Sequence, residues 1–298
     1  MNNSIKDFSN SFHVLFGEHL LPKSKLIYHY TNISGLDGII KTRKIWATNP
    51  YYLNDKSEIT YAIEVIRSVI NKINNTIKNE FILDFIDFFE KKEIKDIYVV
   101  CLTENCDLLS QWRGYGGIEN SYAIGFDSYY LFKDLVNNGI LYRVIYEREI
   151  QEELFNYIIE YFIMFYTLNN KYKEIDKLNL MQILYEIILC FIPIIKNYSF
   201  HEENEVRFIS FEFIPENIFS ATLHQKAIKH RSSDKFFIPF IELSISPTDK
   251  INNPIEEIII GPSAYPDLSF QSLNTYISRN AEHPNKIKIR HSTIPFRI

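Results

Sequence analysis

The stretch LIYHYTNISGLDGIIKTRKIWATNPYYLNDKSE, residues 26–58, organises the first part of the chain. Its apolar start predicts a strand that ends at Asn32, a residue typical of turns. Apolar residues then recur at helical spacing from 33 to 40, and Ser34 is placed to cap this helix. Residues 45–48 (IWAT) predict a second strand. The stretch therefore predicts a strand, a helix and a strand in succession.

His29, Tyr30 and Thr31 lie where the first strand meets the helix. Backbone N–H groups and the positive end of the helix dipole gather at such a point, and they favour an anionic ligand. A histidine at a strand end can also serve packing alone. Both interpretations stay open from the residues themselves.

The rest of the chain mixes helical and strand patterns without the regular βαβ order of a doubly wound fold. With 298 residues, of which 46% are hydrophobic, it can bury a sizeable core. The sequence predicts an α+β fold with a mixed or antiparallel sheet at its core, in one domain that spans residues 1–298. The predicted strands are 97–102, 122–126, 140–146, 205–209, 236–243, 257–260 and 286–290, and the further predicted helices are 1–24, 57–73, 80–92 and 266–279.

Residues 149–197 predict two long helices joined by a polar segment. We interpret this region as a helical insertion within the domain. Such an insertion can gate a site, dock a regulatory partner or simply complete the core. The sequence does not choose among these roles.

Charge and cysteine content limit the class of protein. The formal net charge of −5 argues against indiscriminate nucleic-acid binding, which depends on an excess of Lys and Arg. A local basic run could still steer a nucleic acid, or it could be a solvated loop. The run consists of His224, Lys226, Lys229, His230, Arg231 and Lys235.

The three cysteines, Cys101, Cys106 and Cys190, fit a reducing cytosol, and they form no zinc-binding set. The polar N-terminus lacks the pattern of an export signal. The most apolar stretch, 178–195, contains Glu186 and Pro193, so it predicts a buried helix and no membrane span. We therefore expect a soluble, cytoplasmic protein without a membrane contact.

The segment HEENEVR, residues 201–207, concentrates charge on a predicted half-buried strand. Residues two apart on a strand share a face, so Glu203, Glu205 and Arg207 would project together while Val206 points into the core. Arg207 could hold one carboxylate ionised while the other serves a ligand. The alternative is a plain solvated strand face.

A glycine-rich passage, residues 110–117, follows a buried strand and predicts a flexible loop. Ser110, Gln111 and Trp112 supply hydroxyl, amide and indole groups there, and binding residues are frequent on such loops. Trp112 could stack on a ligand ring or anchor the core. The sequence leaves these two roles open.

The motifs together resemble a bacterial family, the domain-of-unknown-function family twenty-nine seventy-one. The resemblance is carried by YHYTN, IIKTRKIWATNPYYLND, CLTENCDLLSQWRGYG, SYAIGFD, ENEVRF and HSTIPFR, in this order from about residue 26 to 297. Val206 is a departure, because the family usually has Trp between the Glu and the Arg. This change concerns packing behind the strand.

The opening stretch also resembles, more distantly, that of ADP-ribosyltransferases. The resemblance implies NAD as substrate, with His29 as the first-strand histidine, Glu205 as the catalytic glutamate and Glu203 as the first acid of a Glu-x-Glu pair. It implies that Tyr122 stacks on nicotinamide, with Ser110 as a rival for this middle position of the motif, and it implies no metal. The other residues that it implies to contact NAD are Tyr30, Thr31, Asn54, Asp55, Gln111, Trp112 and Arg207.

Three functions follow as hypotheses. The first is an NAD-consuming enzyme, a toxin or phage-defence effector, that transfers ADP-ribose to a protein or nucleic-acid acceptor or hydrolyses NAD. The second is a metal-dependent nuclease or hydrolase that uses His29, Asp55, Glu58, Glu203 and Glu205. The third is a non-catalytic sensor that binds a nucleotide.

Overall fold

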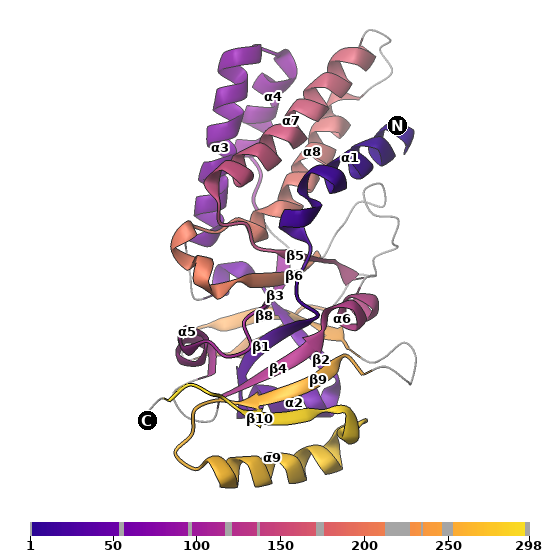
Figure 1. Cartoon of the computed structure of the whole chain (residues 1–298). Helices are drawn as coiled ribbons and strands as arrows, with labels where there is room; N and C mark the ends of the chain where they lie inside the picture. The colour runs from indigo at the N-terminus through magenta and orange to yellow at the C-terminus, as the bar shows by residue number, and fades with distance from the viewer. Residues whose placement is uncertain are drawn as a thin grey trace.

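The computed structural model describes residues 2–53, 57–94, 97–116, 121–135, 138–170, 176–211, 227–233, 235–245 and 253–295. Asn54, Asp55, His224 and Lys226 lie outside the described residues. The molecule is elongated, with a layer of helices at one end, a sheet in the middle and a single helix beyond the sheet at the other end (Figure 1).

The opening stretch forms the predicted strand, helix and strand: β1 (Leu26–Asn32), α2 (Ile33–Thr42) and β2 (Lys44–Thr48). The N-cap of α2 is Asn32, whose side chain accepts a hydrogen bond from the backbone N–H of Gly35 at 2.9 Å. Ser34, predicted to cap the helix, lies inside its first turn. A short 3₁₀ helix, η1 (Pro50–Tyr52), follows β2.

The described strands form one ten-stranded sheet. Its pairs are antiparallel except for β9 with β10, which confirms the predicted α+β fold with a mixed sheet. The strands after β2 are β3 (Ile97–Thr103), β4 (Ser121–Asp127), β5 (Ile140–Arg143), β6 (Glu205–Phe211), β7 (Lys229–Ser232), β8 (Phe237–Ser244), β9 (Ile255–Ile260) and β10 (Lys288–His291).

Strand β3 is the branch point of the sheet. One edge of β3 pairs with β6 along its whole length, from Ile97 to Thr103. Its other edge meets β1 only at Thr103, opposite Tyr28, and β2 only at Val99, opposite Thr48. Between these two points β1 and β2 diverge, so the middle of β3 around Cys101 has no strand partner on that edge. A gap therefore opens in the sheet there.

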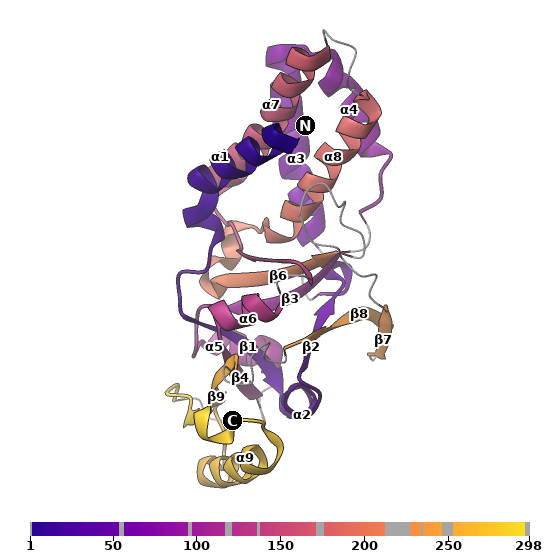
Figure 2. The same cartoon turned by 90° about the vertical axis from the view of Figure 1, so that its right-hand side faces the viewer.

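One face of the β3–β6 region is covered by five helices (Figures 1 and 2). The two helices predicted within 149–197 are both present, and they pack with the earlier helices α3 and α4 around a common apolar core. Ile and Phe stripes at helical spacing build this core, as the periodicity predicts. The five helices are α1 (Asn2–Leu20), α3 (Glu58–Ile77), α4 (Glu80–Glu90), α7 (Arg148–Asn170) and α8 (Lys177–Phe191).

A second apolar core lies on the opposite face of the sheet. It is covered by α2, α6 (Ser128–Leu135) and α9 (Pro266–Asn280), with α9 at the far end of the molecule (Figure 1). Asp127 caps α6 by accepting hydrogen bonds from the N–H groups of Tyr129 and Tyr130 at 3.0 and 3.1 Å.

Three local predictions were wrong. Residues 109–116 form a short helix, α5 (Leu109–Gln111), and a π-helix, η2 (Trp112–Gly116), and not a flexible loop. Strand β6 is buried on both faces, and not half-buried, because helices cover one face and the second core the other. The solvated-loop alternative for the basic run was wrong for residues 229–232, which form β7, although these residues are exposed.

One helix, over Lys177–Ile194, has the length and apolar composition of a membrane span. Within the protein, 67% of it is buried against other parts of the chain. This agrees with the predicted buried helix.

Candidate functional site

A small cavity of about 40 Å³ lies where β1 and β3 separate. Residues that are far apart in the sequence meet in it, from β1, β3, the α5–η2 turn and the segment before β6. The lining side chains include several of the predicted site residues. The cavity is lined by Tyr28, His29, Tyr30, Cys101, Leu102, Thr103, Gln111, Tyr115, Glu203 and Glu205.

His29 projects from β1 into the gap beside β3. Its Nδ1 lies 3.0 Å from the backbone carbonyl oxygen of Cys101. A carbonyl can only accept a hydrogen bond, so Nδ1 carries the proton and Nε2 is left as an acceptor. Burial lowers the pKa of His29, and the positive charge of Arg231 lowers it further. The imidazole is therefore neutral near pH 7.

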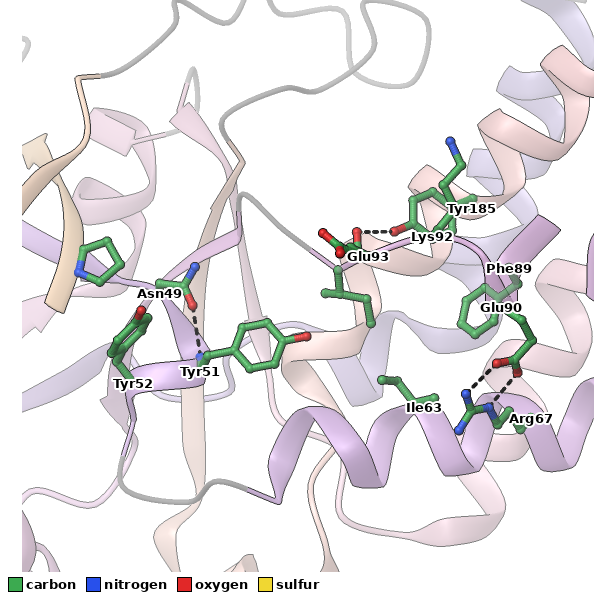
Figure 3. A pocket seen from close by; sticks show the side chains of 12 residues that line it. Asn49, Tyr51, Tyr52, Ile63, Arg67, Phe89, Glu90, Lys92, Glu93 and Tyr185 are labelled. Carbon is green, nitrogen blue, oxygen red and sulfur yellow. Dashed lines mark hydrogen bonds and ion pairs between the residues drawn. The ribbon is translucent and has the colours of Figure 1, made fainter. Parts of the chain in front are cut away.

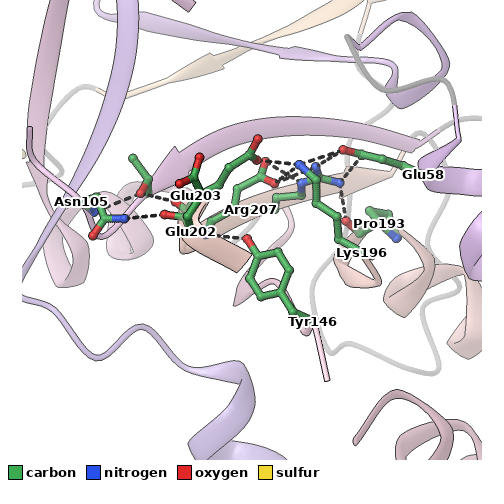
Figure 4. Close-up of polar contacts among 10 residues, drawn as sticks. Glu58, Asn105, Tyr146, Pro193, Lys196, Glu202, Glu203 and Arg207 are labelled. Carbon is green, nitrogen blue, oxygen red and sulfur yellow. Dashed lines mark hydrogen bonds and ion pairs between the residues drawn. The ribbon is translucent and has the colours of Figure 1, made fainter. Parts of the chain in front are cut away.

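Glu205 and Arg207 form a buried ion pair with two hydrogen bonds. Arg207 donates from Nε to Glu205 Oε1 at 2.8 Å and from Nη2 to Oε2 at 2.9 Å. Its remaining donors reach the carbonyl of Pro193 at 2.6 Å and Glu58 Oε1 at 3.0 Å. Glu205 is only 4% exposed and Arg207 only 1%. Figure 4 shows the guanidinium of Arg207 between these partners.

Lys196 joins three carboxylates at the same place. Its Nζ lies 2.6 Å from Glu203 Oε2, 3.1 Å from Glu58 Oε1 and 3.2 Å from Glu205 Oε2. We call Glu58, Lys196, Glu203, Glu205 and Arg207 the charge cluster (Figure 4). Sequence analysis missed Lys196. The available signal was a single lysine that ends the apolar run before the acid-rich segment HEENE.

Glu203 and Glu205, the two acids of the charge cluster that come from the HEENE segment, have opposite pKa shifts. Burial alone would raise the pKa of Glu205, but Arg207 and Lys196 outweigh burial and hold this pKa well below its usual range. Burial raises the pKa of Glu203, and the hydrogen bond from Lys196 offsets this only in part. Among the described residues, Glu203 Oε1 receives no hydrogen bond, and 17% of the side chain is exposed. Glu203 is therefore the acid with an oxygen left for a ligand.

The interpretation of 201–207 as one open strand face was wrong. Residues 198–203 form a 3₁₀ turn, and Asn204 takes a left-handed conformation with φ 43° before β6 begins. Asparagine tolerates this conformation better than most residues. Glu203 and Glu205 still converge, but through Lys196 and under the helical layer, and not on a solvated strand. The solvated-face alternative is excluded by their burial.

Trp112 anchors the core and does not line the cavity. It is 2% exposed, and its ring packs edge-on against Tyr30 at a centroid distance of 4.5 Å. Its Nε1 donates to Asp107 Oδ1 at 2.8 Å. Tyr30 lines the cavity, but its hydroxyl is occupied, since it donates to the carbonyl of Asn105 and accepts from the N–H of Leu108, each at 3.0 Å. Both residues hold the α5–η2 turn against β1.

We expect Trp112→Phe to lower the free energy of unfolding by about 1.5–3 kcal/mol, because the hydrogen bond to the Asp107 carboxylate is lost while the apolar packing is mostly kept. Chemical denaturation measures this change. Trp46→Phe is the matched control, since Trp46 is 44% exposed. Equal stability of the two variants would contradict the assignment of Trp112 to the core.

The remaining predicted residues lie apart from the cavity. Tyr122, on β4, is 7% exposed and packs in the second apolar core, and Ser110 is exposed on α5. Thr31 is half-buried at the end of β1, where its Oγ1 lies against Gly35. The cavity has no lining atom from any of the three. Of the residues on the α5–η2 turn that were predicted to contact NAD, only Gln111 lines the small cavity. Tyr115, on the same turn, also lines it and was not among the predicted residues.

A larger cavity, of about 710 Å³, lies between η1 and the helices α3, α4 and α8 (Figure 3). Two charged side chains of its lining are paired with each other, because Arg67 donates two hydrogen bonds of 2.7 Å to Glu90. Lys92 donates to Gln182 at 2.9 Å and lies over the Phe88 ring. We assign the chemistry to the small cavity, since acids and a neutral histidine meet there.

One family model matches the chain, over residues 111–208. Its description is "Protein of unknown function (DUF2971)". This segment is similar to that family, which confirms the resemblance for the part of the sequence from Gln111 to β6. It contains Lys196, Glu203, Glu205 and Arg207. No curated protein and no solved structure matches the chain.

The carboxylates of the charge cluster, of which Glu203 and Glu205 lie in the DUF2971-like segment, are arranged around an ammonium group. Lys196 Nζ occupies the point between Glu58, Glu203 and Glu205 that a divalent cation would need. Among the described residues, no three His, Cys, Asp or Glu side chains lie together as a metal site would require. Asp55, part of the metal hypothesis, lies outside the described residues.

Proposed function

We propose that this protein is an ADP-ribosyltransferase-like enzyme that consumes NAD at the cavity between β1 and β3. One observation carries the proposal. A neutral histidine from the opening strand and two acids from the segment before and at the start of β6 line the same cavity. These positions are more than 170 residues apart in the sequence, and only the fold brings them together.

The charges suit cleavage of the bond between nicotinamide and ribose. As this bond breaks, its electron pair leaves with nicotinamide, and positive charge develops on the ribose carbon, as in glycoside cleavage. A fixed negative charge beside that carbon stabilises the transition state. Glu205 is held ionised by Arg207 and Lys196, and Glu203 offers a free carboxylate oxygen.

We assign direct contact with the substrate to Glu203. Both oxygens of Glu205 are bound by Arg207, so Glu205 contributes through its charge and through the position of Lys196. His29 Nε2 is free to accept a hydrogen bond from a ribose hydroxyl. Glu203 can then take the proton of the attacking acceptor, a role that suits its raised pKa.

NAD does not fit into about 40 Å³, because ligand cavities usually measure about 300–1,000 Å³. The substrate must therefore displace a lining group. Tyr115 is the best placed, since its side chain is 39% exposed and it belongs to η2. A π-helical turn is a rare element that is frequent at functional sites. We infer that Tyr115 moves outward when the substrate enters.

The proposal also includes transfer of ADP-ribose to a protein or nucleic-acid acceptor, a cytoplasmic location, and a role as an effector in toxicity or phage defence. The three cysteines are free thiols, which suits a reducing compartment. The arrangement favours the first hypothesis over the metal-dependent one, since Lys196 fills the centre of the acids. A sensor that binds a nucleotide without cleaving it remains the second candidate for the same cavity.

Release of nicotinamide from NAD tests the proposal. We expect release by the purified protein, with or without a cell extract that supplies the acceptor, and we expect it to persist in a chelator. We also expect His29→Ala to lower the rate, because the ribose loses its acceptor. Chelator-sensitive phosphodiester cleavage would instead support a metal-dependent hydrolase. Tight NAD binding without release would support a sensor.

A further inference from the structure

Strands β2, β8 and β7 carry cations and aromatic rings on one face. Trp46 pairs with Glu242 across β2 and β8, and Lys229 and Arg231 of β7 pair with Phe240 and Ile238 of β8. Side chains of directly paired residues, and of residues two apart on a strand, share a face. This side of the sheet therefore presents Lys44, Trp46, Lys229, Arg231, Phe240 and Glu242.

Several aromatic rings are exposed on or beside this face. Trp46 is 44% exposed, and its ring packs on the buried Phe240 at a centroid distance of 4.3 Å, which holds the indole in place. Phe236, two residues before Ile238 and so on the same side, is 49% exposed, and its ring centroid lies 5.8 Å from that of Tyr52. Single exposed apolar residues are common, but a contiguous group on a protein surface indicates a binding site.

Positive charge dominates the same face. Lys44 and Lys229 both contact Glu242, at 2.7 and 2.9 Å, so one carboxylate serves two ammonium groups. Arg231 lies against Thr48 at 3.5 Å. The face has three cations and one acid among the residues that the structure describes, in a chain whose net charge is −5. Positive charge is therefore concentrated on this face, although the net charge of the chain is negative.

We propose that this aromatic–cationic face binds single-stranded nucleic acid. Unpaired bases can stack on Trp46 and Phe236, while the phosphates meet Lys44, Lys229 and Arg231. Two strand spacings, about 10 Å, separate β2 from β7, so the face is wide enough for two or three nucleotides. Duplex bases are already stacked on each other and would not reach the rings. A single strand is therefore favoured over a duplex.

The face leads to the small cavity. Strand β2 meets β3 at Thr48, next to the gap in the sheet, and Arg231 is close enough to His29 for its charge to act on the imidazole. A strand bound here would place a nucleotide near the acids. Only its role as the ADP-ribose acceptor rests on the proposed function, whereas binding itself does not.

Fluorescence anisotropy with a labelled, mixed-sequence, single-stranded oligonucleotide tests the proposal, with no NAD present. We expect binding that weakens with salt, with a slope of log affinity against log salt of about −2, since three cations contact single-stranded phosphates. We expect Trp46→Ala to weaken binding by about tenfold, because one stacked base is lost. Lys229→Ala should remove about one phosphate contact, so the slope of log affinity against log salt should become shallower by the share of that contact.

Two matched controls separate this surface from general effects. Tyr265→Ala removes a ring that is 71% exposed near α9, and Lys72→Ala removes a lysine that is likewise paired with one glutamate, Glu152, in the helical layer. Both should bind as the unmodified protein does. Phe236→Ala replaces Trp46→Ala if thermal melts show that the latter unfolds.

The proposal is overturned if the test variants bind like the controls, if a duplex of the same sequence binds as well, or if unlabelled NAD competes with the oligonucleotide. Nicotinamide release is measured separately without nucleic acid. A failure of oligonucleotide binding therefore leaves that measurement unaffected, and the reverse also holds.

Discussion

Glu205→Gln is expected to lower the free energy of unfolding by about 3–5 kcal/mol, because it removes one partner of a buried ion pair and leaves the other charge uncompensated. Arg207 is 1% exposed and Lys196 is 3% exposed, so neither can turn to solvent. Glu203 still pairs with Lys196, but Glu58 would be the acid left beside Arg207 and would share its charge with Lys196. From the sequence, with Glu205 on an open face, this change would barely affect stability.

Chemical denaturation of the two proteins measures this effect at neutral pH. Glu242→Gln is the matched control, since Glu242 also contacts two cations, Lys44 and Lys229, but lies at the surface. We expect this control to lose no more than about 1 kcal/mol, as surface ion pairs do. A similar loss in both variants would show that Glu205 is not the centre of a buried cluster.

The same cluster predicts a dependence of stability on pH. The folded pKa of Glu205 is lower than its unfolded value of about 4.5, so its stabilising contribution is present above pH 4.5 and is lost as the pH falls below it. The raised pKa of Glu203 acts in the opposite direction. We expect the difference in stability between the unmodified protein and Glu205→Gln to shrink as the pH is lowered from about 5 to 3. A constant difference would contradict an ionised Glu205.

Glu203→Gln is expected to reduce nicotinamide release by about a hundredfold to a thousandfold, the usual effect of removing one stabilising group at a developing charge. The amide keeps the size of the side chain and a hydrogen-bonding oxygen, but it has no negative charge and cannot accept a proton. NAD affinity should change much less than the rate. Release by the unmodified enzyme should also decline at acidic pH, because Glu203 must be ionised and its pKa is raised above 4.5.

Glu202→Gln is the control for this experiment. Glu202 is the adjacent acid, but it is exposed, and its contact in Figure 4 is made by its backbone carbonyl, which accepts from Asn105 at 2.9 Å. It should retain the full rate. Near-normal release by Glu203→Gln would refute its role, and release lost equally in both variants would point to damage of the 3₁₀ turn. A stability measurement on each variant separates a loss of chemistry from a loss of fold.

The sequence by itself determined the elements and many of their ends. Periodicity placed the strand–helix–strand opening and the four helices of the helical layer that follow β2, because these depend on neighbours within a few residues. It also predicted that Val206 and Phe208 point into the core, where both are fully buried. Alternation along a strand is a local property, so it can be seen in the chain alone.

Only the tertiary structure decided what those residues do. Whether the Glu205 face meets water or a helical layer depends on where α3 and the Pro193–Lys196 segment pack, and no local pattern encodes that. Lys196 belongs to the site because it contacts three carboxylates, and one of them lies 138 positions earlier in the chain (196 minus 58). Trp112 and Tyr122 were assigned to a ligand by motif, but packing places both in apolar cores. Burial, and with it the pKa of each acid, is set by contacts between distant segments, which is why the sequence named the acids but not their environment.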